Sequence, residues 1–115
     1  MATSTLPLNK FRLLATTLSS GSNMIYSSSL DISTIVLSAL ITNVSNTIQT
    51  TTVKVQKSGS LDQVTLVKDA YIPVTEALNP FSGKIVLERY DALYFESPTS
   101  GSLEAVLSVL ENANN

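Results

Sequence analysis

The carboxylates are the side chains of this sequence best suited to acid–base chemistry, because the chain contains neither histidine nor cysteine. Glu88 and Asp91 flank an expected turn, and Glu96 lies on the next expected strand. A facing pair of carboxylates can hydrolyse a glycosidic bond, but sugar sites also use aromatic platforms, and aromatic residues make up only 6% of the chain. We therefore interpret these carboxylates as solvated groups at strand ends.

The same groups, together with Asp31, Asp62 and Asp69, are the candidates for a calcium site. Calcium takes about six to eight converging oxygens, usually from a dense acidic loop, and the sequence has no Asp-x-Asp-x-Asp run. A serine nucleophile needs a base, and a lysine lies within two residues of a serine only in the expected turns at residues 57–59 and 82–84. We expect no catalytic residue, no metal site and no cofactor.

The charge pattern also argues against several kinds of partner. Lys and Arg total 7 against 9 Asp and Glu, and they form no basic stripe of the kind that binds nucleic acid. Glycine-rich phosphate loops are absent. The longest apolar stretch, residues 35–44, is interrupted by polar residues and is far shorter than the roughly 20 residues of a membrane helix. We expect no nucleic acid, no membrane and no small-molecule substrate.

Short β-type runs separated by Gly, Pro, Asn and Ser clusters are the elements that must position all these side chains. Their regular spacing predicts an all-β fold of about eight or nine short strands, a sandwich or a barrel, of which we favour the antiparallel β-sandwich. We expect residues 1–9 to be an N-terminal arm, residues 10–111 a single sandwich domain, and residues 112–115 a polar tail.

Two segments are ambiguous in their pairing or type. Residues 84–88 and 92–96 are interpreted as a hairpin. Residues 103–111 fit a helix, with Leu103, Val106, Leu107 and Leu110 on one stripe, or a strand that turns alternate residues inward. We favour the strand, which places these residues inward: Leu103, Ala105, Leu107 and Val109.

Several expected strands carry apolar residues on both faces, whereas a half-solvated antiparallel strand should alternate. Within residues 33–43, the inward row is expected to be Ile35, Leu37, Ala39 and Ile41. In the first strand the expected inward row is Phe11, Leu13 and Ala15, with Leu14 and Leu18 opposite. Because charged residues are only 14% of the chain, we interpret the outward apolar residues as an assembly interface, comprising Val36, Leu40, Val106 and Leu110. Plain solvent exposure remains the alternative.

Residues 84–93, KIVLERYDAL, resemble the KIVLE-x-x-D-x-L segment of small β-sandwich virion structural proteins of tailed bacteriophages. The Tyr26-Ser27-Ser28 turn, Ile72-Pro73 and the closing run at residues 106–111 are similar too, so the resemblance covers roughly residues 25–111. The sequence departs from the pattern at Arg89-Tyr90, where the family has a small residue and a glycine.

The resemblance implies an Ig-like or jelly-roll-like β-sandwich. It also implies a non-enzymatic virion subunit attached to capsid, neck or tail, with a decoration, cement or adaptor role. Its partners would be other virion proteins and copies of itself, and it would be assembled in the host cytoplasm. The alternative is an adhesive sandwich that binds a receptor or carbohydrate. That alternative requires two or three tyrosines on one exposed loop face, drawn from Tyr26, Tyr71, Tyr90 and Tyr94.

Overall fold

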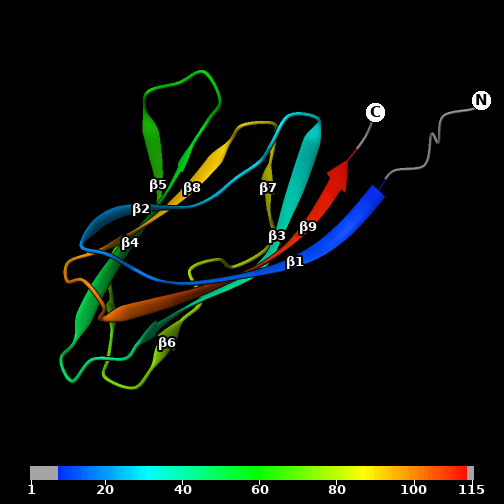
Figure 1. Ribbon diagram of the computed structural model, residues 1–115. Coiled ribbons are helices and arrows are strands. Elements are labelled where there is room, and N and C mark those ends of the chain that lie inside the picture. The colour runs from blue at the N-terminus through cyan, green and yellow to red at the C-terminus, as the bar shows by residue number, and fades with distance from the viewer. Residues whose placement is uncertain (1–7, 114–115) are drawn as a thin grey trace, which may run out of the picture.

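The computed structural model describes residues 8–113, and its two antiparallel sheets confirm the predicted β-sandwich class (Figure 1). The strands are β1 (Leu8–Thr17), β2 (Gly21–Ser27), β3 (Ile32–Asn43), β4 (Gln49–Gln56), β5 (Gln63–Ile72), β6 (Ala77–Leu78), β7 (Ile85–Leu87), β8 (Ala92–Ser97) and β9 (Leu103–Ala113). Among these residues there is no helix long and apolar enough to cross a membrane.

One sheet has five strands and the other has four. The five-stranded sheet follows the order β1-β9-β3-β6, with β7 also pairing with β3, and the four-stranded sheet follows the order β2-β8-β4-β5. The chain therefore passes between the sheets several times, and β9 lies between β1 and β3 in the middle of the larger sheet (Figure 1).

The core lies between the sheets and is built from alternate residues of each strand. Leu103, Ala105, Leu107 and Val109 of β9 are all buried, which confirms the strand interpretation of residues 103–111. From the opposite sheet, Leu93 and Phe95 of β8 meet them with no exposed surface. Each buried side chain of this size stabilises the fold by about 1.5–3 kcal/mol.

The inward row predicted for β3 is wrong in its first half. Val36 has no exposed surface and lies in the core, whereas Leu37 is half-buried and lies outside it. The reason is a β-bulge: Val36 pairs with Val109 and Ser38 pairs with Ser108, so Leu37 is an extra residue with no partner on β9. Beyond the bulge, Ala39 and Ile41 face inward as predicted.

The faces predicted for β1 are reversed. Leu18 is buried and Leu14 packs against the core, whereas Phe11 is 73% and Leu13 is 69% exposed. The charge of Arg12 suggests that its side of β1 faces solvent, but Arg12 shares the inward face with Leu14. Its guanidinium lies 3.1 Å from the carboxylate of Glu111, which accounts for a charged residue on this face.

Residues 84–96 do not form the predicted hairpin. β7 pairs with β3 in the larger sheet, and β8 pairs with β2 and β4 in the smaller one. A tight turn carries the chain from one sheet to the other, with Asp91 N donating to Glu88 O at 3.0 Å and Tyr90 at a φ of 66°. The backbone of Tyr90 thus takes the left-handed conformation for which a glycine is better suited.

The predicted domain bounds are narrower than the strands. β1 begins at Leu8 and β9 ends at Ala113, and these two residues pair with each other. Two residues assigned to the arm and two assigned to the tail therefore belong to the larger sheet. Residues 1–7 of the predicted arm and residues 114–115 of the predicted tail lie outside the described residues.

Candidate assembly interface

The outer face of the five-stranded sheet carries apolar side chains that line up across its strands. In one row, Phe11 of β1 is opposite Leu110 of β9, Leu110 is opposite Ile35 of β3, and Ile35 is opposite Val86 of β7. In a second row, Ala15, Val106 and Leu40 are opposite one another. Between the rows lie Leu13, Ser108 and Ser38. We call these ten residues the outer apolar face.

Most of the large side chains of this face are exposed to solvent, whereas Ile35 and Leu110 are half-buried. Phe11, Leu13 and Val86 are each more than 60% exposed, and Leu40 is 48% exposed. An open hollow of about 360 Å³ is lined by Phe11, Arg12, Leu13, Leu37, Ser108 and Val109. Exposed apolar residues that are grouped in this way mark binding surfaces more often than scattered ones do.

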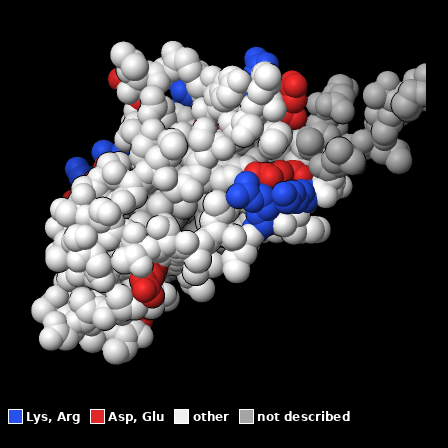
Figure 2. Space-filling model, in the orientation of Figure 1, with Lys and Arg blue, Asp and Glu red and all other residues white. Residues whose placement is uncertain are grey.

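Ionisable groups are scarce on the same face. Among its strand positions on β1, β9 and β3 in the described chain, Glu104 is the one charged residue. Elsewhere the charges occur in small groups on a largely uncharged surface, as the side in view in Figure 2 shows. Two of these groups are ion pairs, Lys54 with Glu96 and Lys57 with Glu88.

The structure brings three of the four predicted interface residues together. Leu40 and Val106 are directly opposite each other on β3 and β9, and Leu110 lies on the same face of β9. Val36 is the exception, because the bulge turns it into the core. The sequence prediction of an interface at Val36 is therefore wrong, and the other three residues stay as predicted interface residues.

Sequence reasoning missed the largest members of this face. Phe11, Leu13 and Ile35 were expected to point inward, and Val86 was not singled out. The signal that could have identified the face of β1 is Leu18, which shares its parity with Leu14 and directly precedes the Ser-Ser-Gly turn. No signal within β3 itself marks the bulge at Leu37.

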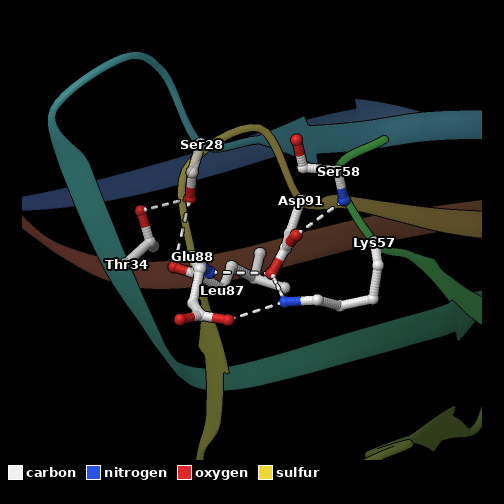
Figure 3. Close-up of polar contacts among 7 residues, drawn as sticks. All are labelled: Ser28, Thr34, Lys57, Ser58, Leu87, Glu88 and Asp91. Atoms are coloured by element: carbon white, nitrogen blue, oxygen red, sulfur yellow. Dashed lines mark hydrogen bonds and ion pairs between the residues drawn. The ribbon is translucent and has the colours of Figure 1, made fainter. Parts of the chain in front are cut away.

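The predicted carboxylates separate into two ion-pair sites. Glu96 pairs with Lys54 at 3.2 Å, whereas Glu88 and Asp91 both bind Lys57 Nζ, at 2.7 and 2.8 Å (Figure 3). Asp91 is buried and accepts two backbone hydrogen bonds, from Ser58 N and from Glu88 N. Asp91 thus binds the backbone as an aspartate in a turn commonly does, and it ties the turn after β7 to the turn after β4.

Electrostatics hold this site in its charged form. Burial by itself raises the pKa of Asp91, but the hydrogen bonds from Lys57, Ser58 and Glu88 together keep it below its ordinary value. Hydrogen bonds to Asp91 and Glu88 raise the pKa of Lys57. A nucleophilic lysine needs a lowered pKa, and a carboxyl that acts as a general acid needs a raised one. The arrangement therefore suits a structural ion pair rather than covalent chemistry.

Lys57 also occupies the place between the carboxylates of Glu88 and Asp91 that a bound cation would take. Asp31 and Arg89 border the same open hollow. Within residues 8–113, no three acidic side chains are grouped so that they could hold a metal ion.

A second polar cluster links the two sheets from inside. The buried hydroxyl of Tyr26 on β2 donates to the carboxylate of Glu111 on β9 and lies 2.9 Å from Thr34 Oγ1 on β3. Arg12 of β1 donates to the same carboxylate. Burial and the hydrogen bond with Glu111 raise the pKa of Tyr26 to about 12. Three strands thus meet at one carboxylate, and Thr34 adds β3 to the cluster through the tyrosine hydroxyl.

The four tyrosines do not gather on one loop face. Tyr26 is buried in the core, Tyr71 lies on β5 opposite Thr50, and Tyr94 lies on β8 opposite Lys54. Tyr90 lies in the turn before β8. Thr50 and Lys54 are four residues apart on β4, or about 13 Å. The stacking platform that the adhesive alternative requires is therefore not formed by these side chains.

Comparison with known proteins shows the fold but no family. No family model matches the sequence, and no curated protein matches it significantly. A solved protein of Bacillus endospore appendages, which form a family of disulfide-linked pili, aligns with a TM-score of 0.54 at 9% identity over 99% of this chain and 96% of its own. The Drosophila NLP core, described for pentamer formation and histone binding, aligns with a TM-score of 0.52 at 15% identity over 89% of this chain and 97% of its own.

Proposed function

We propose that this protein is a non-enzymatic structural subunit that assembles with copies of itself and with other proteins of a tailed-bacteriophage virion. Its role would be decoration, cement or adaptor, on the capsid, neck or tail. The observation that carries the proposal is the outer apolar face, a set of exposed side chains aligned across β1, β9, β3 and β7.

The rest of the molecule supports an assembly role rather than a catalytic one. Its two buried carboxylates are each held by several donors: Asp91 by Lys57 and two backbone amides, and Glu111 by Tyr26 and Arg12. The contacts of Asp91 lower its pKa, whereas a carboxyl that serves as a general acid needs a raised pKa. The two similar folds occur in proteins described as pili and as pentamers, which agrees with a subunit that self-associates.

The test is a pair of substitutions on β3, four residues apart. Leu40→Asp places a charge on the outer apolar face, so the free subunit should keep its melting temperature while self-association and incorporation into particles fall. Val36→Asp buries the same charge in the core and should unfold the free subunit itself. Melting is followed by circular dichroism, and association by sedimentation velocity.

A control on the other sheet separates a local effect from added negative charge. Thr65 is exposed on β5, so Thr65→Asp should change neither melting nor association. If Leu40→Asp leaves both association and incorporation intact, the outer apolar face is merely exposed and the proposal fails.

A further inference from the structure

The free edge of β1 is a long and regular row of unpaired backbone groups. All ten residues of β1 pair with β9 without a register shift, and no other described strand pairs with β1. At the end of the strand, Leu18 N donates to Leu103 O. Because hydrogen-bonded pairs alternate along an antiparallel ladder, the backbone N–H and C=O groups of the even-numbered residues of β1 point toward β9. The N–H and C=O groups of the odd-numbered residues, including Phe11 and Leu13, therefore point away from the sheet.

The other edges of the sandwich are blunted. The ladder between β4 and β5 is interrupted twice, and Asp69 of β5 has a φ of 49°. The ladder of β2 shifts its register between Met24 and Tyr26, and β6 and β7 are two and three residues long. Natural proteins use short, bulged or twisted edges to prevent strand pairing. Among the described edge strands, β1 is the long and unbulged one, and its charged residues Lys10 and Arg12 are the blunting device that it carries.

We propose that a second copy of this chain pairs with β1, antiparallel and edge to edge, about a two-fold axis at Leu13. A two-fold axis perpendicular to the sheet places outward residues of one copy opposite outward residues of the other. Facing residues therefore share their parity, so the axis passes between the two copies of a single residue. Centred on Leu13, the pairing spans residues 9–17, with Lys10 opposite Thr16 and Arg12 opposite Leu14.

Charge selects this register over its neighbours. An axis at Arg12 places two arginines opposite each other, and an axis at Phe11 places Lys10 opposite Arg12; directly opposed like charges destabilise a strand pair. An axis at Leu14 pairs only residues 11–17. The Leu13 register pairs no two cations, and it sets the large Phe11 opposite the small Ala15 on the outward face.

The paired sheet would join the outer apolar faces of two copies into one continuous surface. This inference rests on the proposed assembly function and adds to it the partner, the strand and the register. The test is therefore chosen so that the register can fail while self-association stands.

Disulfide capture reads the register directly, because the native chain contains no cysteine. Lys10 and Thr16 are both exposed, and in the Leu13 register they form a non-hydrogen-bonded pair with Cα atoms about 4.5 Å apart, within the range of about 4.4–6.8 Å that a disulfide spans. Lys10→Cys mixed with Thr16→Cys should give a covalent dimer under mild oxidation. Each variant alone should not, because its two copies of the cysteine would lie about 20 Å apart.

The matched control mixes Lys10→Cys with Thr17→Cys, whose side chain points to the other face of β1 and should not be captured.

Leu13→Asp provides a second measurement without cysteine. In the proposed register it sets two carboxylates opposite each other, so self-association should weaken by more than about tenfold. Association should recover when Leu13→Asp is mixed with Leu13→Lys.

The outcomes separate the two proposals. If the native chain associates but the Lys10→Cys and Thr16→Cys mixture yields no more dimer than the control mixture, the β1 pairing is wrong and the assembly function stands. If Leu13→Asp associates as the native chain does, the pairing is equally wrong. If the native chain is monomeric and does not incorporate into particles, both proposals fail.

Discussion

At the scale of single residues, two buried acids organise the polar interior. Asp91 joins the turns after β4 and β7, and Glu111 joins four strands through Tyr26, Thr34 and Arg12. The role of Asp91 was predictable from the sequence, because an aspartate in a turn commonly accepts nearby backbone amides. The role of Glu111 was not, because it depends on residues that are far apart in the chain.

Asp91→Asn should destabilise the fold by about 1–3 kcal/mol at pH 7, because it removes an ion pair and exchanges an acceptor for a donor in a buried site. The folded-state pKa of Asp91 lies below its ordinary value of 3.8, so its contribution is fully present above that value and is lost as the pH falls through the lower one. Urea unfolding at pH 7 and pH 2 should therefore show a difference between native and variant that shrinks in acid. Asp62→Asn, at an exposed position, should show no such difference.

Tyr26→Phe should also destabilise the fold, by about 1–3 kcal/mol, because it leaves a buried carboxylate with one donor fewer. The pKa of Tyr26 is raised to about 12 from 10.0, so its contribution is present below the ordinary value and is lost as the pH rises through the raised one. Urea unfolding near neutral pH measures the loss, and ultraviolet titration should show that the variant lacks the last tyrosine to ionise. Tyr71→Phe, at a side chain that is 74% exposed, is the control and should leave stability unchanged. Equal stability of the native chain and Tyr26→Phe would contradict the role given to this cluster.

At the scale of the strand, alternation predicted β9 correctly and failed on β3 and β1. β9 has partners on both sides and a regular alternation from Leu103 to Val109, so its pattern is sufficient. In β3 a single extra residue changes which parity faces inward on its two sides. The residues around Leu37 are apolar on both parities, so their pattern does not show where the change occurs. In β1 the choice of face depends on pairing with a strand about a hundred residues away, as in the register of Phe11 with Leu110. Local sequence does not contain that information.

The bulge makes an unusual prediction about deletions. Removal of Leu37 joins Val36 directly to Ser38, which makes the β3–β9 ladder regular and keeps Val36, Ala39 and Ile41 on the inward face. The shortened chain should still fold cooperatively. Removal of Val106 from the regular strand β9 should instead turn Leu107 and Val109 outward and abolish folding. Circular dichroism melting of the two deletions decides the matter: equal loss of structure in both would show that the bulge is required by the fold.

At the scale of the whole molecule, the sparse charges predict how assembly should respond to salt. The outer apolar face itself has no ionisable residue, and Glu104 is the one ionisable residue at the outward positions of β1, β9 and β3 in the described chain. The ion pairs of Lys54 and Lys57 belong to other surfaces. Added salt shortens the screening length from about 10 Å at 0.1 M to about 3 Å at 1 M, which weakens contacts between charges and leaves apolar contacts intact. Self-association of the native chain, measured by sedimentation equilibrium, should therefore stay constant or strengthen between these two concentrations. The melting temperature of the dilute subunit, measured in parallel, controls for effects of salt on the fold. A tenfold or greater loss of affinity in 1 M salt would mean that charged groups outside the outer apolar face hold the copies together.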